Sequence, residues 1–426
     1  MKKSQIFLVV LAGFLWMAIS QNVGVISFSL KPIIKFESPP SHLIFWLSAA
    51  TNIGMLIGAL FSGPLADHIG RKKTIVIYIV IHVISTILGG LSPDILVLIL
   101  FRILVGFGVG GALPIIAALV SEYSSPNIRG RNISFLESFW AYGWLLSLIL
   151  AWGIIPSYGW RTYMVIAGVI SLIFSLSITV IPESQRYLLK VGLKDKARFY
   201  AEMYSSPYIE EISEVKLSKI EELALLFKDR MWVVTIPLWI IWFIITMGYY
   251  GIFIWLPVMV GKVVGEIGQF LQTNFYLYLF IVTLAQIPGY YSAVFLIDKV
   301  GRKLILSIYL IITGISSYFY AFSTDLTSFI VWGCVLSFFD LGAWAAIYTY
   351  TPEQYPTHIR GTGTSWATSC GRIGGILGPM TVFWLGGPSN WIRVFIFFAI
   401  LHIIGGLIAL LGRELKNLEM PELKRK

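Results

Sequence analysis

The chain has 426 residues, of which 57% are hydrophobic and 13% are charged, whereas about a quarter of the residues of a soluble domain are charged. So few charges exclude an ordinary water-soluble enzyme or binding module, because they cannot cover its surface. The net charge of +10 does not indicate nucleic-acid binding, because basic residues beside apolar segments report membrane topology. The two cysteines, Cys334 and Cys370, lie in apolar segments and predict neither a disulfide framework nor a metal cluster.

Apolar segments long enough to cross a hydrocarbon core of about 30 Å recur along the whole chain. We therefore predict an all-α membrane protein with twelve transmembrane helices, at residues 6–30, 43–66, 74–91, 94–120, 132–153, 160–181, 231–258, 270–297, 304–322, 326–350, 361–386 and 390–411. Of the 32 Lys and Arg residues, 25 fall on the side of both termini, five on the opposite side and two within spans. The positive-inside rule then places both termini in the cytoplasm, and we expect a multi-pass protein of the plasma membrane.

A long polar stretch separates the sixth span from the seventh. It predicts an N-terminal six-helix half at residues 1–182, a cytoplasmic central loop at 183–230, a C-terminal half at 231–412 and a basic tail at 413–426. Within the loop, residues 194–204 and 213–228 mix apolar and charged residues at helical spacing. This pattern predicts short helices on the cytoplasmic surface.

The two halves repeat one another at an offset of 231 residues, without a gap. The matched pairs include Asp67 and Asp298, Gly70 and Gly301, Arg71 and Arg302, Glu122 and Glu353, and Arg129 and Arg360. Agreement at so many charged positions predicts two pseudo-symmetric halves. Parallel repeats of six spans are a transporter architecture.

Several motifs carry a family resemblance. Gly63 to Lys72 reads G-P-L-A-D-H-I-G-R-K, Pro182 to Leu189 reads P-E-S-Q-R-Y-L-L, and the segment from Tyr348 to Gly375 contains Y-T-Y-T-P-E-Q-Y-P, R-G-T-G and G-R-I-G-G. These motifs resemble the major facilitator superfamily over essentially the whole chain, in its sugar-porter and organic-ion branches. The niacin-transporter and synaptic-vesicle-protein-like branch is the most similar. The resemblance implies alternating access, with one half moving against the other.

Two departures bear on the substrate and on coupling. Asn22 stands where many relatives carry an acid in the first span, and Trp239, Trp242 and Trp144 stand near positions where sugar porters place glutamines. The first departure leaves proton symport and uniport both open. The second weakens a hexose site.

The loops between spans two and three, and between eight and nine, predict a cytoplasmic gate. We expect Asp67 and Asp298 to face helix N-termini or the arginines Arg129 and Arg360, because opposite charges at helix ends attract. A simpler alternative is that these loops only anchor the topology. The complete set of predicted gate residues is Asp67, Gly70, Arg71, Glu122, Arg129, Asp298, Gly301, Arg302, Glu353 and Arg360.

Four charges within spans are candidates for substrate binding or coupling, because ionisable groups are costly there. They are Arg102, Glu137, Asp340 and Arg372. Through the repeat, Asp340 lies seven residues from Arg102 and Arg372 four residues from Glu137, so the members of each pair share a helix face. All four are therefore expected to point inward. The alternative is that they neutralise one another, with Glu137 near enough to a span end to reach the interface.

Aromatic residues provide a second group of candidates. Tyr249, Trp344 and Tyr348 lie on spans that the resemblance places around the central cavity, where they would stack on a ring or a sugar face. His82 and His402 are single histidines in spans three and twelve, and we expect them to be packed or lipid-facing.

Taken together, these features predict a secondary transporter of a small organic solute. An organic anion or aromatic carboxylate is favoured as the substrate. Asp340 is the expected proton carrier, and Arg102, Arg372 and Asn22 are further candidates for substrate binding or coupling. A sugar or polyol transporter, a uniporter and a receptor with a transporter fold remain as alternatives. We expect no enzyme activity, cofactor, metal or nucleic-acid partner, and a monomer whose partners are its substrate, protons and the lipid bilayer.

Overall fold

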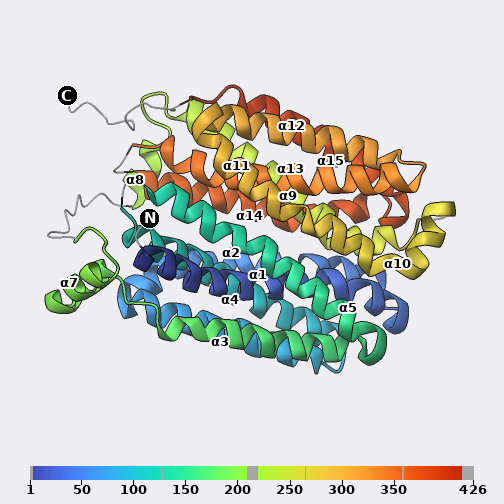
Figure 1. The fold of residues 1–426 in the computed structure, drawn as a ribbon, viewed down its shortest axis with the longest axis horizontal. Helices are drawn as coiled ribbons and strands as arrows, with labels where there is room; N and C mark the ends of the chain where they lie inside the picture. Colours follow the sequence, from blue (N-terminus) through green and yellow to red (C-terminus); the bar gives the residue numbers. More distant parts are fainter. Residues whose placement is uncertain (1–2, 126–127, 209–218, 264, 357–358, 415–426) are drawn as a thin grey trace. The chain divides into compact units, whose positions relative to one another are not determined.

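A computed structural model describes residues 3–125, 128–208, 219–263, 265–356 and 359–414. These residues form long α-helices joined by short loops (Figure 1), which confirms the predicted all-α class. The chain divides into two compact units, unit 1 (Met1–Ser213) and unit 2 (Glu214–Lys426). The division falls inside the predicted central loop.

Unit 1 contains five long helices and three short ones among its described residues. α1 packs on α5, α2 on α4, and α3 on both α4 and α5. The bounds are α1 Lys3–Glu37, α2 Ser41–Ile69, α3 Arg71–Gly90, α4 Ile95–Glu122, α5 Arg129–Ser175, the 3-10 helix η2 Leu176–Thr179, α6 Gln185–Lys190 and α7 Lys194–Met203.

Unit 2 repeats this arrangement. α9 packs on α14, α11 on α13, and α12 on α13 and α15. The bounds are α8 Lys219–Leu225, α9 Trp232–Val260, α10 Gly265–Leu284, α11 Gln286–Val300, α12 Arg302–Ala321, α13 Leu326–Glu353, α14 Arg360–Trp384, the 3-10 helix η3 Pro388–Asn390 and α15 Trp391–Ala409. The helices α12, α13 and α14 each begin 231 residues after α3, α4 and α5, so the repeat seen in the sequence is also a repeat of helix boundaries.

Ten helical segments among the described residues are long and apolar enough to cross a membrane. One of them, Arg129–Thr179, is 51 residues long, about twice what one crossing needs. Within it Gly159 has φ +79°, a left-handed conformation that interrupts the helix between the two spans predicted there. α14 has 25 residues but is not among the ten, because Gly, Ser, Thr and Arg dilute its apolar residues.

The helix pair α2 and α4 approach each other closely through glycine. A Cβ on Gly54 would lie 1.9 Å from the backbone oxygen of Ile103, and one on Gly106 would lie 1.9 Å from that of Thr51. Small residues allow membrane helices to approach backbone to backbone. This approach places the Thr51 side chain beside Arg102 of α4.

The first turns of α4 and α13 are capped in the same way. The Asp94 side chain accepts from the Val97 amide at 2.9 Å, and the Asp325 side chain accepts from the Ser328 amide at 2.9 Å. An aspartate at the N-cap pairs an amide that the helix leaves free. Both helices therefore start at a residue that the repeat conserves within the chain.

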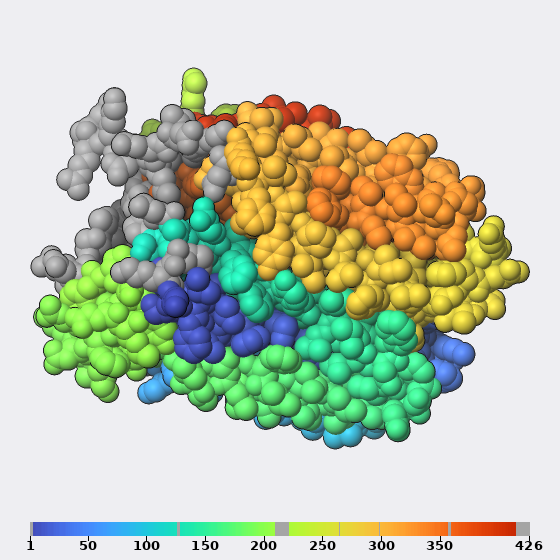
Figure 2. All heavy atoms as spheres, in the orientation of Figure 1, coloured from blue at the N-terminus to red at the C-terminus, as the bar shows by residue number. Residues whose placement is uncertain are grey.

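The segment after η2 begins the central loop. α7 matches the first predicted surface helix, while α8 covers part of the second, whose residues 213–218 lie outside the described residues. In Figure 2 the light green α6 and α7 segment forms a projecting lobe beside the dark blue N-terminal residues. Gln5 of α1 donates to the Ser205 carbonyl at 3.0 Å, which ties this lobe to the start of the chain.

Candidate functional site

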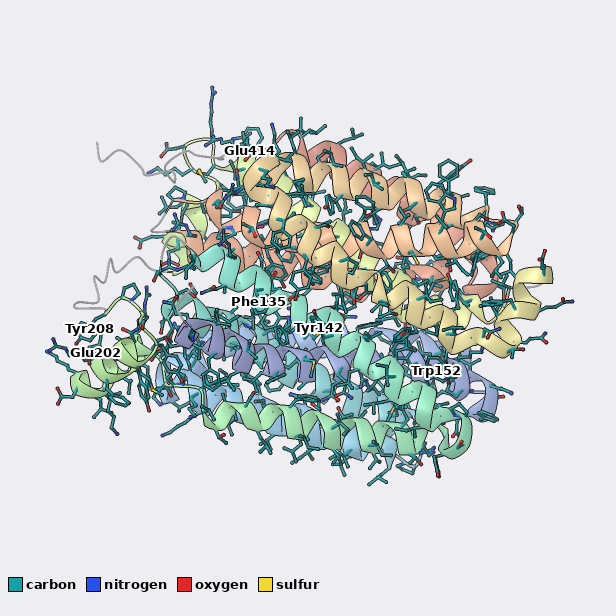
Figure 3. All side chains as sticks on the ribbon, in the orientation of Figure 1. Phe135, Tyr142, Trp152, Glu202, Tyr208 and Glu414 are labelled. Carbon is teal, nitrogen blue, oxygen red and sulfur yellow. The ribbon has the colours of Figure 1, made fainter. Side chains whose placement is uncertain are left out.

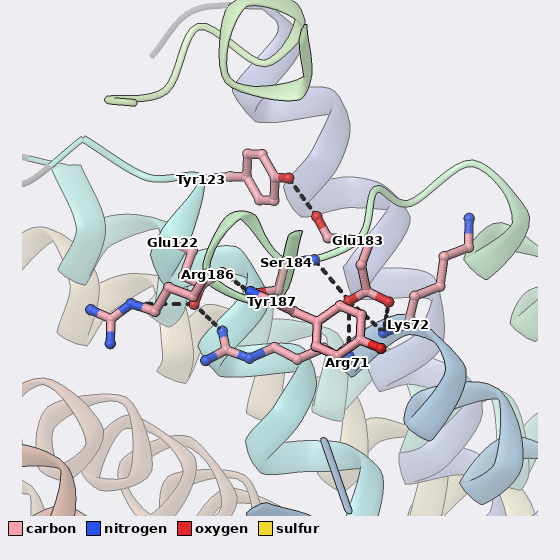
Figure 4. Close-up of polar contacts among 8 residues, drawn as sticks. All are labelled: Arg71, Lys72, Glu122, Tyr123, Glu183, Ser184, Arg186 and Tyr187. Carbon is pink, nitrogen blue, oxygen red and sulfur yellow. Dashed lines mark hydrogen bonds and ion pairs between the residues drawn. The ribbon is translucent and has the colours of Figure 1, made fainter. Parts of the chain in front are cut away.

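A cluster at one end of unit 1 joins α2, α3 and α4 to the segment after η2 (Figure 4). The Glu183 carboxylate accepts from the backbone amides of Arg71 at 2.8 Å and Lys72 at 3.1 Å, the first two residues of α3. A carboxylate there pairs free amides and meets the positive end of the helix dipole. Gly70 precedes them at φ +96°, and a Cβ on it would lie 2.6 Å from Glu183 Oε2. The motif therefore needs glycine for both conformation and space.

Glu122 connects this cluster to α4. Its carboxylate lies 2.5 Å from the Arg71 guanidinium and 3.6 Å from that of Arg186, and it accepts from Ser184 Oγ at 2.6 Å. The neighbouring Tyr123 hydroxyl donates to the Glu183 carbonyl at 2.6 Å. Burial, with Glu122 and Glu183 nearby, raises the pKa of Tyr123, so this hydroxyl stays a donor at neutral pH.

Unit 2 contains the same cluster, built from residues at the 231 offset. The Glu414 carboxylate (labelled in Figure 3) accepts from the amides of Arg302 at 3.3 Å and Lys303 at 3.0 Å. Gly301 has φ +117°, and a Cβ on it would lie 2.5 Å from Glu414 Oε2. Arg302 pairs with Glu353 at 3.2 Å. The predicted gate residues Arg71, Glu122, Arg302 and Glu353 are thus brought together within their own units.

Of the two aspartates of the predicted gate, only Asp67 has a side chain among those that the structure describes. Within unit 1 the amides of α3 are bound by Glu183, while Asp67 is exposed in the last turn of α2 and its backbone carbonyl accepts from Lys190 Nζ at 2.9 Å. The side chain of Asp298 lies outside those described. Arg129 is exposed, with Glu122 and Arg186 as its electrostatic neighbours, and Arg360 donates to the Tyr355 carbonyl at 3.3 Å.

Sequence reasoning missed Glu183 and Glu414 as the residues that bind these amides. The signal was present, because the two are separated by 231 residues, as are Arg71 and Arg302, and Glu122 and Glu353. Glu183 and Glu414 follow the last span of each half, apart in sequence from the loops whose amides they bind.

Arg102 lies at the centre of a buried polar network in unit 1. Its Nε and Nη2 donate to Thr51 Oγ1 at 3.1 and 2.9 Å, and Nη2 also donates to the Asn22 carbonyl at 3.0 Å. The side chain is 1% exposed, and Nη1 has no hydrogen-bond partner among the described residues. The partners of this guanidinium within the described part of unit 1 are neutral, and Asn22, which stands where many relatives carry an acid, contributes its backbone carbonyl.

The Asn22 side chain faces a histidine. Its Nδ2 lies 2.8 Å from His82 Nδ1 and 3.0 Å from Ser171 Oγ. His82 is buried, so it is packed inside unit 1 and not turned to lipid. An amide donates to an imidazole nitrogen without any ionised group, so this contact is neutral.

Glu137 is buried on α5, with 1% of its surface exposed, so it does not reach the interface as the alternative required. Neither of its carboxylate oxygens has a hydrogen-bond partner among the described residues. Arg102 and Glu137 therefore do not pair with each other within unit 1.

Asp340 is buried on α13 and faces His402 of α15. Asp340 Oδ1 lies 3.3 Å from His402 Nε2, and both residues are 1% exposed or less. The sequence identified Asp340 as a candidate, but His402 only as a packed or lipid-facing residue; it is packed, and its partner is the candidate acid. Arg372 of α14 is hydrogen-bonded to the Tyr250 hydroxyl of α9.

The three predicted aromatic residues lie together in unit 2. The Trp344 ring lies 5.7 Å from Tyr249 and 5.9 Å from Tyr348, and Trp242 joins them at 5.8 Å from Trp344 and 4.8 Å from Tyr348. We call these four residues the aromatic cluster. Trp344 Nε1 is buried without a hydrogen-bond partner among the described residues. The cluster therefore combines ring faces with one unused N–H donor.

The family follows from the match of the chain to known proteins. Residues 10–425 match the family described as sugar (and other) transporter. The chain belongs to this transporter family, a branch of the major facilitator superfamily. It is a multi-pass membrane transporter of the plasma membrane and not an enzyme.

Individual members refine the comparison. The chain is 36% identical to the niacin transporter NiaP of Acinetobacter baylyi over 410 residues, covering 94% of this chain and 92% of that protein. It is 27% identical to a synaptic vesicle 2-related protein of Xenopus laevis, covering 93% of this chain and 76% of that protein. The predicted resemblance to these two kinds of transporter is confirmed.

A solved structure gives the fold. The inward-open xylose transporter XylE from E. coli superposes with a TM-score of 0.77 at 17% identity, covering 98% of this chain and 99% of that one. This similarity establishes the fold of the transporter and leaves its substrate to be argued from the side chains.

Proposed function

We propose that this transporter carries a small aromatic carboxylate of the niacin type across the plasma membrane by alternating access, coupled to protons. Arg102 carries the anion part of the proposal. A buried guanidinium is costly without an anionic partner, yet the partners of Arg102 within the described part of unit 1 are neutral and its Nη1 is unused. A substrate carboxylate would supply the missing charge.

The aromatic cluster supports the ring part of the proposal. Tyr249, Trp344 and Tyr348 offer aromatic faces, and offset or edge-to-face contacts with a planar ring stabilise binding by about 0.5–1.5 kcal/mol beyond burial. The unused Trp344 Nε1–H suits an acceptor on the ring. The A. baylyi relative is a niacin transporter, and niacin is a pyridine carboxylate.

Twelve crossings with both termini in the cytoplasm belong to the same proposal. Gly159 interrupts the 51-residue segment Arg129–Thr179, and the 25 residues of α14 are enough for one crossing. Adding these two to the ten apolar segments gives an even number, so both termini lie on one side. The excess of basic residues puts that side in the cytoplasm.

A binding comparison tests the anion part of the proposal. Purified protein is titrated with nicotinate, nicotinamide and xylose. Nicotinate and nicotinamide share the pyridine ring but only nicotinate is an anion, and xylose is a neutral sugar. We expect nicotinate to bind about tenfold or more tightly than nicotinamide, because a hydrogen bond to a charged group contributes about 1.5–3 kcal/mol.

The matched variants are Arg102→Lys and, as a control, Arg161→Lys. Lysine cannot reproduce the planar fork that grips a carboxylate, so Arg102→Lys should weaken nicotinate binding markedly and leave nicotinamide nearly unchanged. Arg161 pairs with Glu37 at 3.2 Å and is half-exposed, and its change should alter neither. Tighter binding of xylose than of nicotinate, with no effect of Arg102→Lys, would replace the anion by a sugar and leave Arg102 as a structural residue.

A further inference from the structure

The contacts of His402 fix which of its ring nitrogens carries a hydrogen. His402 Nδ1 lies 2.7 Å from the backbone oxygen of Phe398, one turn earlier on α15. A carbonyl oxygen can only accept a hydrogen bond, so Nδ1 must be the donor. In a neutral imidazole the other nitrogen, Nε2, then has only a lone pair.

That lone pair faces the Asp340 carboxylate. Nε2 and Oδ1 are 3.3 Å apart, and neither atom has a different hydrogen-bond partner among the described residues. An ionised carboxylate also has only lone pairs, so the two groups repel each other unless one proton lies between them. With that proton, the contact is a hydrogen bond whichever group holds it.

We propose that Asp340 and His402 together form a site for one transported proton, and that His402 is a coupling residue as much as Asp340 is. This inference rests on the proposed function, in which transport is proton-coupled. The pair carries a charge of −1 when empty and is neutral when it holds the proton. Binding one proton therefore stabilises the buried pair, because it removes the net charge. A second proton would make the pair a buried cation, which is costly.

Among the described residues of unit 2, the ion pair of Asp340 is with His402 alone. His402 is the electrostatic partner of Asp340 among the described residues. On the helices packed against α13 and α15, the described charged side chains near helix ends are Glu266, Lys299, Arg302, Lys303 and Arg360, while Arg372 is bonded to Tyr250. The titratable side chains of α9 are Tyr249 and Tyr250, and the tyrosines of α12 are Tyr309, Tyr318 and Tyr320.

α9 covers the imidazole with a glycine. A Cβ on Gly248 would lie 2.1 Å from His402 Cε1 and 2.4 Å from Nε2, so the histidine fits only because this residue has no side chain. The next residue, Tyr249, contacts Trp344, which lies one helical turn after Asp340 on α13. α13 therefore carries residues of both the proton site and the aromatic cluster, and α9 packs on His402 while supplying Tyr249 to the cluster. A substrate ring that contacts Tyr249 would bear on α9, and through Gly248 on the His402 ring that faces Asp340.

Nitrogen-15 NMR of the purified full-length protein tests the tautomer directly. The chain has five histidines, and all of them are labelled. The signal that disappears in His402→Gln belongs to His402. We expect Nδ1 of His402 to carry a hydrogen throughout the range from about pH 5 to 8, the interval in which histidines ordinarily titrate. A tautomer with the hydrogen on Nε2 would overturn the proposal, because that ring donates to an ionised Asp340 without any additional proton.

Transport by reconstituted vesicles tests whether Asp340 and His402 couple nicotinate transport to protons. In Asp340→Asn the amide N–H donates to Nε2 and imitates the loaded pair, so nicotinate exchange between equal pools should stay within about threefold of the parent protein. Accumulation driven by a pH gradient should fall at least about tenfold. His402→Gln should also lose accumulation, and the exposed His42→Gln should behave as the parent.

The outcomes separate this inference from the proposed function. Full accumulation by both Asp340→Asn and His402→Gln, with exchange intact, would refute the proton site while nicotinate transport stands. Absence of nicotinate exchange in the parent protein would instead refute the proposed substrate. If Asp340→Asn does not fold, the NMR result on the parent protein still decides the tautomer.

Discussion

The two units each bury one histidine against one polar residue, but the chemistry of the two pairs differs. In unit 1, His82 meets the neutral amide of Asn22, next to the cation Arg102. In unit 2, His402 meets the carboxylate of Asp340. The first arrangement is stable without titration and leaves a positive charge for a substrate anion. The second needs a proton to become a hydrogen bond. One unit is thereby suited to the anion and the other to the proton.

The repeat does not relate these pairs to each other. At the 231 offset Asp340 corresponds to Val109, His402 to Ser171, His82 to Thr313 and Asn22 to Phe253. The clusters at the helix ends, by contrast, keep the same glycine, arginine, lysine and two glutamates: Gly70, Arg71, Lys72, Glu122 and Glu183 match Gly301, Arg302, Lys303, Glu353 and Glu414. Helix ends are held by backbone geometry that both units share, whereas the interiors have diverged to take different roles.

Moving the acid from unit 2 to unit 1 tests whether the difference between the two histidine pairs matters for proton coupling, and it should have the largest effect. The double variant Asn22→Asp with Asp340→Asn should lose at least about tenfold in pH-driven accumulation, like Asp340→Asn alone. His82 Nε2 has no partner among the described residues, so its ring is free to place the hydrogen on Nδ1 and to donate to the introduced carboxylate without an extra proton. Accumulation restored by the double variant would show that any buried acid beside a histidine is enough.

Asn22→Asp alone tests whether Arg102 of unit 1 binds the substrate anion. The new carboxylate would lie on the residue whose carbonyl already contacts Arg102, and it would pair with the guanidinium in place of a substrate anion. We expect nicotinate affinity to fall about tenfold, an effect of roughly 1.4 kcal/mol, measured by calorimetric titration. Unchanged affinity would mean that Arg102 does not bind the anion.

Removing the unused donor of the aromatic cluster sharpens the role of unit 2. Trp344→Phe keeps a ring beside Tyr249 and Tyr348 but deletes the Nε1–H. A hydrogen bond of ordinary strength contributes about 0.5–1.5 kcal/mol, so nicotinate affinity should fall about two- to tenfold. Benzoate, which lacks the ring nitrogen, should lose less; an equal loss for both ligands would argue against a bond to the ring nitrogen.

The shared helix-end clusters should give the smallest effects. Glu183→Gln and Glu414→Gln each remove a charge from a helix N-terminus, a change of about 0.3–1 kcal/mol, and should lower Tm by roughly 1–4 °C. Glu183→Gln should cost more, because Glu183 also accepts from the Ser184 amide at 2.8 Å. A larger loss in Glu414→Gln would show that the two clusters are not equivalent in strength.

Most of the fold could be predicted from the sequence, because the length of each apolar segment and the charges beside it are local properties that determine where a membrane helix begins and ends. The predicted spans agree with the long helices to within a few residues at most ends, and the repeat anticipated the equal starts of α3 and α12. Arg71, Glu122, Arg302 and Glu353 could be grouped for the same reason, since their spacing recurs in both halves.

The interior contacts could not be predicted in this way. Whether Asp340 meets Arg372 or His402 depends on the rotation and packing of α13, α14 and α15, and helix periodicity within one span does not fix that. His402 has neither a motif nor a repeat partner that is a histidine. The space that receives its ring is created by Gly248, a residue with no signal of its own in a single sequence.

Proton movement that accompanies nicotinate is the measurement that tests the central claim most directly. Vesicles containing the purified protein and an internal pH indicator are given external nicotinate without any imposed gradient. We predict that the interior acidifies with one proton for each nicotinate taken up beyond any carried by the free acid itself, and that Asp340→Asn takes up labelled nicotinate without this acidification. Nicotinate entry with no acidification in the parent protein, or equal acidification in Asp340→Asn, would contradict it.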